Sequence, residues 1–414
     1  MALSAAARVV TVGAAPASGP AGDESAAVAA VLGAAGVPVA ARAFVDEDEA
    51  ALESALGGDV GLTVVLAGAG GSTGDVVRRV LARVAGVRLV LNERMLAALE
   101  ETYRRQDRPL PRRAERLALL PQGAAVWTAD GEPGWALDGP RGAVVVLPRT
   151  GALPPALERP LVELARARAG TRGAMLTRTL RTAGVGLAEL EERLAEWLGG
   201  GESRPGDVSV AVLPADGEVW VRLRARGATT EAAAEALAAV ESAVAAALGE
   251  DCYGRDGESL EQAVGRLLTA RGLTLAVAES CTGGLVGHRL TNVPGASAYF
   301  ERGVVVYSNR AKQELLGVPE SVLRAHGAVS APCAEAMARG VCAAAGSACG
   351  LAVTGVAGPD GGTPAKPVGT VFVGVAVGGE VASRRFRFGG DRAAVKWQSA
   401  QMALDMLRRR LGGT

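Results

Sequence analysis

The amino-acid sequence predicts a multi-domain α/β protein, with two α/β/α domains and a small α+β module between them. The chain has 414 residues, which is more than the roughly 100–200 residues of an ordinary domain. Short apolar runs alternate with Ala- and Leu-rich runs over residues 8–70, and the same alternation returns after residue 259. Such alternation is typical of βαβ units around a mainly parallel sheet.

The first domain is expected at about residues 1–165. Its strand-like runs include RVVTVG (8–13) and LTVVLAGAG (62–70), with the helical runs ESAAVAAVLGAAG and EAALESALG between them. GAVVVLP (142–148) supplies a further buried strand, and the proline-marked run after it indicates a connection. The apolar stretch at the start of the chain is short and strand-like, so it is interpreted as a core strand rather than as a signal peptide.

The middle module is expected at about residues 166–253. The run VSVAVLPADGEVWVRLRAR (208–226) contains two alternating stretches joined at Asp216-Gly217, which is a β-hairpin signal. Helical runs lie on both sides of this hairpin. Nothing in the module points to chemistry, and Trp197 and Trp220 are expected to be packing anchors.

The third domain, about residues 254–414, begins with a clearly marked helix. Ser259 and Gln262 have the spacing of a capping box at the start of an apolar stripe. The buried strand LTLAVA (273–278) follows, and a closing helix is expected from Asp391. Alternating strands and helices between these points predict a three-layer α/β/α domain.

The composition excludes several classes of function. Basic and acidic residues number 44 each, so the chain lacks the charge of a nucleic-acid or membrane-surface binder. No apolar run approaches the roughly 20 residues of a membrane span, and we expect a cytoplasmic protein. Five cysteines in no CxxC or His-paired spacing, and only two histidines, argue against a disulfide framework or a zinc site.

The segment AESCTGG (278–284) is the strongest candidate for a nucleophile. Ser280 directly follows a buried strand and precedes an apolar helix, so its hydroxyl should project at the edge of the sheet. Backbone N–H groups of Cys281, Thr282 and Gly283 would then stabilise an oxyanion. Two alternatives stay open from these residues. In the first, Ser280 or Thr282 is only an ordinary helix N-cap. In the second, the thiol of Cys281 is the nucleophile.

Lys312 is the candidate base. Only three of the 44 basic residues are lysine, and only lysine gives up its proton near neutral pH. In YSNRAKQELLG, Ser308 or Asn309 is a natural N-cap, so Lys312 falls in the first helical turn. There the helix dipole lowers the pKa of an ammonium group, and Tyr307 is placed to orient it. The alternative is an exposed surface lysine.

Other arrangements fit less well. A Ser–His–Asp triad requires His288 or His326 to fold onto a serine, but the first lies mid-helix and the second precedes a helix-ending glycine. The Gly/Pro-rich run TGVAGPDGGTPAKPVGT (354–370) allows backbone amides to approach a phosphate, with Lys366 or Arg392 supplying charge. It matches neither a Walker A nor a GxGxxG pattern.

In order, AESCTGG, YSNRAK, GAVS, TGVAGPDGG, KPVGTV and FGGDRAAV closely resemble the C-terminal domain of the CinA family, the nicotinamide-nucleotide amidases. The resemblance implies hydrolysis of nicotinamide mononucleotide to nicotinate mononucleotide and ammonia, without metal or cofactor, in a homodimer. The catalytic roles would fall on Ser280, Lys312 and Tyr307. Lys396 stands where the family more often has Arg. The substrate-binding positions would be Thr282, Gly283, Gly284, Thr354, Gly358, Thr370 and Arg392.

The middle module resembles the family's linking module at GVGLAEL (184–190), and the first domain resembles its molybdopterin-binding-like domain. In some members the latter is a metal-dependent pyrophosphatase acting on ADP-ribose. Here Asp75 remains, but Val76 replaces a second carboxylate and Arg78 replaces a threonine. Two further glycine motifs of the family are also altered here. Residues 131–134 are GEPG, and Arg149 takes the place of a glycine.

We therefore expect the first domain to be a scaffold that lacks pyrophosphatase activity. Two alternative functions are that this domain retains ADP-ribose pyrophosphatase activity, or that the chain is a non-enzymatic dimeric interaction protein linked to competence or DNA repair. The neutral net charge argues against direct binding of DNA.

Overall fold

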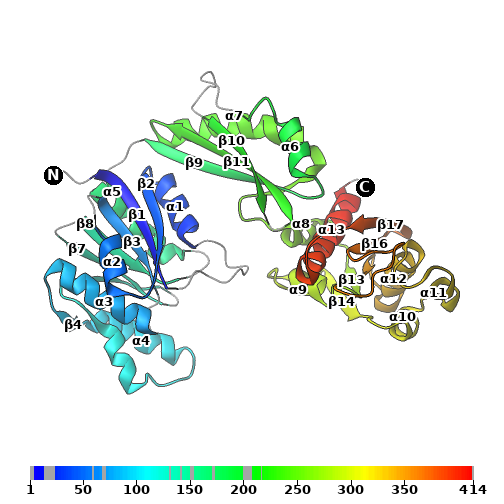
Figure 1. The fold of residues 1–414 in the computed structure, drawn as a ribbon, viewed down its shortest axis with the longest axis horizontal. Coiled ribbons are helices and arrows are strands. Elements are labelled where there is room, and N and C mark those ends of the chain that lie inside the picture. Colours follow the sequence, from blue (N-terminus) through cyan, green and yellow to red (C-terminus); the bar gives the residue numbers. More distant parts are fainter. Residues whose placement is uncertain are drawn as a thin grey trace. The chain divides into compact units, whose positions relative to one another are not determined.

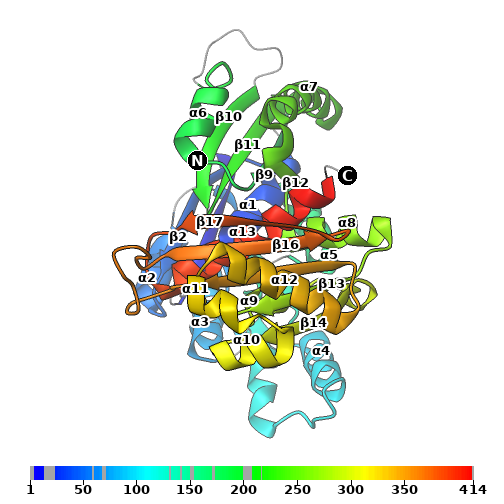
Figure 2. The same cartoon turned by 90° about the vertical axis from the view of Figure 1, so that its right-hand side faces the viewer.

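The chain folds into three α/β parts, each built around its own sheet (Figures 1 and 2). The computed structural model describes residues 4–13, 24–57, 60–67, 71–129, 132–139, 142–149, 153–169, 173–198, 208–215 and 217–412. The predicted fold class, two larger α/β domains with a small α+β module between them, is confirmed.

The first domain has a six-stranded sheet of order β2-β1-β3-β8-β7-β6. The first four strands are parallel, and β7 and β6 continue the sheet antiparallel. The start of the chain forms β1 in the interior of the sheet, as predicted. The strands are β1 (Ser4–Val12), β2 (Val39–Val45), β3 (Val60–Leu66), β6 (Ala125–Trp127), β7 (Gly134–Gly139) and β8 (Gly142–Leu147).

Helices cover both faces of this sheet because neighbouring residues of a strand point to opposite sides. Val65 of β3 packs in one core with helices α2 and α3, whereas Val64 packs in the other with α1 and α5. A separate two-stranded ribbon, helix α4 and a 3-10 helix at Arg112–Ala118 also belong to the domain. The remaining bounds are α1 (Glu24–Ala34), α2 (Glu49–Ala55), α3 (Gly71–Ala85), β4 (Leu89–Leu91), α4 (Glu93–Arg104), β5 (Leu119–Pro121) and α5 (Pro155–Ala169).

The linking module has a four-stranded sheet of order β10-β11-β9-β12. The predicted hairpin is present as β10 and β11. Asp216 of its turn lies outside the described residues, and Gly217 has the left-handed φ of +80° that a tight turn favours. The elements are β9 (Ala174–Thr182), α6 (Leu187–Arg193), β10 (Val208–Ala215), β11 (Glu218–Gly227), α7 (Thr230–Leu248) and β12 (Cys252–Arg255).

Helix α7 corrects the expectation that no segment is long and apolar enough to span a membrane. By length and composition alone, the segment Thr230–Asp251 passes that test. Its Leu237, Val244 and Leu248 are buried at helical spacing. Its Glu241 is also buried and forms ion pairs of 3.0 Å with Arg178 and Arg255. A helix that buries one apolar face and an ion-paired carboxylate is typical of packing against a sheet.

The third domain has a five-stranded sheet of order β14-β13-β15-β16-β17. β14, β13 and β15 are mutually parallel, and β16 and β17 are antiparallel additions. The predicted capping box of Ser259 and Gln262 begins α8. The strands are β13 (Leu275–Glu279), β14 (Phe300–Val305), β15 (Cys349–Gly355), β16 (Thr370–Val377) and β17 (Glu380–Arg387).

Three helices pack in each of the two cores beside this sheet, which gives the predicted three layers. One core contains residues of α8 (Leu260–Arg271), α9 (Leu285–Thr291) and α13 (Arg392–Gly412). The other contains residues of α10 (Asn309–Leu316), α11 (Glu320–His326) and α12 (Ala331–Ala345).

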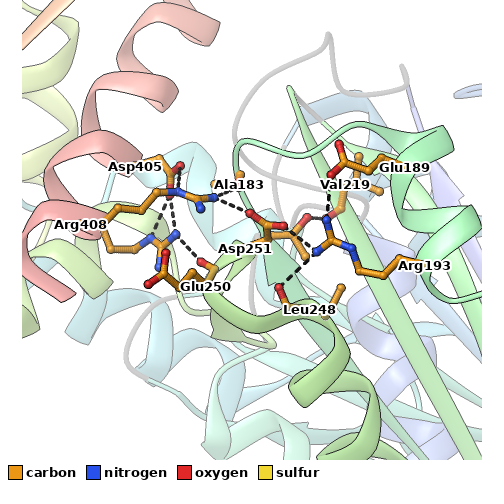
Figure 3. A network of polar contacts seen from close by, with 11 residues as sticks. Ala183, Glu189, Arg193, Val219, Leu248, Glu250, Asp251, Asp405 and Arg408 are labelled. Carbon is orange, nitrogen blue, oxygen red and sulfur yellow. Dashed lines mark hydrogen bonds and ion pairs between the residues drawn. The ribbon is translucent and has the colours of Figure 1, made fainter. Parts of the chain in front are cut away.

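A network of arginines and acids joins α13 to the linking module (Figure 3). Residues 178–198 and 239–255 of the module form one compact unit with the third domain. The side chain of Asp405, which is 1% exposed, accepts hydrogen bonds from Arg408 and Arg409. Arg409 also donates to Asp251, at 2.6 Å, and Arg193 donates to the other carboxylate oxygen of that residue. Asp405 thus organises the cationic side of this contact.

Replacing Asp405 with Asn should destabilise α13. Two arginines would lose a buried carboxylate, and breaking a buried pair in this way costs about 3–5 kcal/mol. Amide hydrogen exchange of α13 in the full chain measures this loss. Glu320→Gln is the control, because its ion pair with Arg324 is largely exposed and should contribute little. Equal exchange in the two variants would contradict the assigned role of Asp405.

Candidate active site

The predicted site segments meet at one edge of the third-domain sheet. Ser280 follows β13, and its N–H donates to the carbonyl of Val353 in β15 at 2.9 Å, which sets Ser280 beside Thr354. Tyr307 and Lys312 follow β14. Since these three strands are parallel, their carboxyl ends share an edge. Thr370 begins the antiparallel β16 and therefore lies at the same edge.

Strand alternation determines which side of the sheet each group occupies. In β13, Leu275 and Val277 belong to the core of α8, α9 and α13. Ala276 and Ala278 belong to the core of α10, α11 and α12. Continuing this period of two turns the side chain of Glu279 toward α9, and that of Ser280 toward α10.

Ser280 and Lys312 are in direct contact. Lys312 Nζ lies 3.1 Å from Ser280 Oγ and 2.7 Å from the carbonyl oxygen of Val306. Lys312 is 1% exposed, so it is not the surface lysine of the alternative interpretation. Ser308 caps α10 and places Lys312 in its first turn, as predicted. Burial, rather than the helix dipole invoked from the sequence, is the main cause that lowers the pKa of Lys312.

The helix-cap interpretation of the nucleophile segment is wrong. Helix α9 begins at Leu285, and its N-cap is Gly284 in a left-handed conformation, so neither Ser280 nor Thr282 caps it. The rival nucleophile Cys281 is buried, and burial raises the pKa of its thiol to about 12. That thiol is therefore protonated at neutral pH and is a poor nucleophile.

Histidine does not reach the serine through any hydrogen bond of the described residues. His288 lies mid-helix in α9 beside Asn292, and His326 ends α11. Lys366 donates to the carbonyl of His326 at 2.8 Å. Of the two cations proposed for a phosphate from the sequence, Lys366 thus lies beside the end of α11.

Glu279 is a site residue that the sequence analysis missed. Its buried carboxylate accepts hydrogen bonds from the N–H groups of Gly284, Val286 and Gly287 at 2.8–3.1 Å. These three N–H groups at the start of α9 are therefore not available to a substrate. The available signal was an acidic residue just before a glycine-rich helix start, where a carboxylate is stabilised.

The N–H groups ahead of that helix are different. Within the described part of the chain, the N–H groups of Cys281, Thr282 and Gly283 donate to no oxygen acceptor, and those of Cys281 and Thr282 lie near the Cys281 thiol. Gly283 and Gly284 both have left-handed φ angles, +62° and +97°. These angles fold the segment into a tight turn beside Ser280.

Tyr307 does not orient Lys312, which corrects the expected role. The side chain of Tyr307 is 63% exposed, and its hydroxyl accepts a hydrogen bond of 3.0 Å from Arg392. Arg392 also donates to the carbonyl of Gly358 at 2.6 Å. The backbone carbonyl of Val306 holds Lys312 instead. The guanidinium group of Arg392 thus links two other predicted positions, Tyr307 and Gly358.

The three predicted threonines are all buried, but their hydroxyls differ. Thr354 Oγ1 donates to the carbonyl of Ala328 at 2.8 Å. Thr282 Oγ1 and Thr370 Oγ1 are buried without a hydrogen-bond partner. An unpaired buried hydroxyl costs about 1–3 kcal/mol, so such groups call for an explanation.

A cavity of about 530 Å³ opens at the start of α13. Lys396 belongs to its lining, and its Nζ lies 3.7 Å from the position that a Cβ atom on Gly283 would take. Positive charge therefore lies next to the nucleophile segment. The lining residues are Leu285, Asp391, Arg392, Ala393, Lys396 and Trp397.

In the first domain, arginine side chains lie against the one acid that is retained at the altered site. Arg78 is buried and ion-pairs with Asp75, and Arg116 lies 3.8 Å from the other oxygen of that carboxylate. Val76 is buried. Arg149 is held by Glu24 at 2.9 Å, whereas residues 68–70 and 131 lie outside the described residues. The one retained acid is thus paired with cations that oppose a divalent ion.

Comparison with known proteins identifies the family. Residues 257–411 match the CinA C-terminal domain, residues 177–254 the damage-inducible protein CinA KH domain, and residues 8–157 a probable molybdopterin binding domain. The chain is 41% identical over 393 residues to a CinA-like protein of Geobacter sulfurreducens, covering 93% of this chain and 94% of that one. The chain belongs to the CinA family.

The chain is also similar to other CinA proteins. A putative competence-damage inducible protein of Symbiobacterium thermophilum is 40% identical over 85% of each chain. A crystal structure of a CinA superfamily protein from Klebsiella pneumoniae is 37% identical over 37% of this chain and 97% of that chain, with a TM-score of 0.37.

The unpaired threonine hydroxyls of this CinA protein give a test of the site. Thr282→Val and Thr370→Val should each raise the free energy of unfolding by about 1 kcal/mol, because each removes an unpaired buried hydroxyl. Thr354→Val is the matched control and should lower it by about 1 kcal/mol, since a hydrogen bond is lost. Urea unfolding measures all three. A loss of stability in all three variants would show that the two hydroxyls have partners.

Proposed function

We propose that the third domain hydrolyses the carboxamide of nicotinamide mononucleotide, giving nicotinate mononucleotide and ammonia. The observation that carries this proposal is the 3.1 Å contact between Ser280 Oγ and the buried Lys312 Nζ. A lysine of lowered pKa beside a serine hydroxyl is a base within reach of a nucleophile. The family resemblance of the segments around both residues supports the choice of substrate.

The reaction follows from the positions of these two groups. Ser280 Oγ attacks the carboxamide carbon while neutral Lys312 accepts the hydroxyl proton. The N–H groups of residues 281–283 stabilise the oxyanion that develops on the carbonyl oxygen. Lys312 then gives its proton to the departing nitrogen, and ammonia leaves an acyl-serine. Water then attacks this ester, and Lys312 accepts a proton from the water. When Lys312 passes this proton to Ser280 Oγ, the carboxylate product is released.

The charges of the substrate fit the groups around the serine. The cationic pyridinium ring makes the carboxamide carbon more electrophilic and requires no positive charge beside it, which suits a neutral lysine. The exposed ring of Tyr307 offers a face on which that cationic ring can stack. Arg392 and Lys396 offer cations to the phosphate group.

The two alternative functions have less support. Pyrophosphatase activity in the first domain needs a divalent cation, and the one retained acid, Asp75, is ion-paired with Arg78. A purely non-enzymatic role leaves the burial of Lys312 against Ser280 without a purpose. The homodimer and the cytoplasmic location remain predictions from the sequence.

Ammonia release tests the proposal. The purified full chain should release ammonia from nicotinamide mononucleotide, equally with and without a chelator. Ser280→Ala and Lys312→Ala should each lower kcat by about 1,000-fold or more, as for removal of a nucleophile or its base. Lys312→Arg should be equally inactive, because Arg does not give up its proton.

Cys281→Ala is the matched control and should retain activity, since its thiol is protonated. Full activity of Ser280→Ala, or loss of activity on chelation, would refute the mechanism.

A further inference from the structure

Glu279 is a buried acid that the proposed reaction does not use. It is the last residue of β13, directly before the nucleophile, and is 2% exposed. Its side chain faces α9, on the opposite side of the sheet from Lys312, so it does not touch the reacting groups. One carboxylate oxygen accepts from Gly284 and Val286 at 3.0 and 3.1 Å, and the other accepts from Gly287 at 2.8 Å.

These three bonds close a small ring of backbone around the nucleophile. At its start, the N–H of Ser280 is bound to Val353 and the carbonyl of Glu279 accepts from Val306 at 2.8 Å. At its end, the N–H of Gly284 is bound to the Glu279 carboxylate. The four residues between, 280–283, carry the nucleophile and the three N–H groups that donate to no oxygen among the described residues. Backbone hydrogen bonds to Val353 and Val306 thus fix the start of the reacting segment, and the Glu279 carboxylate fixes its end.

A carboxylate suits this arrangement better than an amide. All three partners are N–H donors, and a carboxylate accepts on both oxygens, whereas a neutral amide presents one donor group of its own. The two left-handed glycines, Gly283 and Gly284, bring the chain back over the carboxylate. The carboxylate also neutralises the positive end of α9, which leaves the phosphate of a substrate to Arg392 and Lys396.

We propose that Glu279 is a positioning residue for the nucleophile. Its carboxylate holds residues 280–283 in place. Ser280 Oγ then remains hydrogen-bonded to Lys312, and the N–H groups of residues 281–283 face the attacked carbonyl. This role rests on the proposed amidase function, but it also predicts the intrinsic reactivity of Ser280 toward any serine-directed reagent.

Glu279→Gln tests the role, since it keeps the length of the side chain but places an NH2 group against an N–H donor. Two readouts are compared: ammonia release from nicotinamide mononucleotide, and the rate at which a fluorophosphonate probe labels Ser280, followed by mass spectrometry. Both kcat and the labelling rate should fall by about 10- to 100-fold, as for a misplaced reacting group. KM should stay within about threefold, because the cations that would bind the phosphate are untouched.

Glu261→Gln is the matched control. Glu261 is a mostly buried acid that pairs with Arg289 of α9 at 2.7 Å, and among the described residues its side chain is hydrogen-bonded there rather than to residues 280–283. This variant should lose stability while Ser280 keeps its labelling rate. If Glu279→Gln likewise loses only stability and keeps both rates, Glu279 is a helix cap alone and the proposal is overturned.

Two further results complete the test. If Glu279→Gln fails to fold, Glu279→Asp keeps the charge but is one methylene shorter, and an unchanged labelling rate in that variant would overturn the proposal. Labelling of Ser280 in the wild type without ammonia release would refute the substrate, whereas the Glu279 comparison would still be decided by the labelling rates. Absence of labelling at Ser280 in the wild type would overturn both.

Discussion

The chemistry proposed for the third domain depends on the burial of a lysine side chain beside a serine. An ammonium group loses much of its hydration on burial, and without a carboxylate partner the neutral amine becomes favoured. Among the described residues no carboxylate pairs with Lys312, and its hydrogen-bond partners are a hydroxyl and a carbonyl. The neighbouring ionisable groups are the thiols of Cys281 and Cys333, and burial raises the pKa of both. Within the described part of the chain, no carboxylate therefore lies beside Lys312 to restore the proton.

The sheet converts this local chemistry into a site. Parallel pairing of β13, β14 and β15 brings the serine, the lysine-bearing helix and Thr354 to one edge. The alternation of β13 then assigns successive residues to separate tasks. Glu279 stabilises the start of α9 on one side, and Ser280 meets Lys312 on the other. A shift of one residue in this strand would exchange the two sides. The arginine network of α13 joins the same domain to the linking module. In the first domain, arginine instead pairs with Asp75, the acid retained at the altered site.

Patterns local in the sequence predicted much of this structure, and long-range contacts explain the rest. The capping box of Ser259, the hairpin strands and the placement of Lys312 in a first helical turn each depend on a few adjacent residues. The partner of Tyr307 is Arg392, 85 positions away, and the carbonyl of Val306 is a backbone group that every residue carries. Neither has a sequence signature. Glu279 was missed because an acid before a helix is a common surface cap, and only the fold shows that it is buried.

The titration of Lys312 tests the central claim most directly. The chain has only three lysines, so NMR of protein labelled with 15N at the lysine side chains should give three resolvable signals, assigned by Lys312→Arg. We predict that Lys312 loses its proton at a pH clearly below the ordinary pKa of lysine, because burial opposes its charge. A Lys312 signal that titrates at or above the ordinary value would contradict the account, because the amine would then be charged and unable to accept the serine proton.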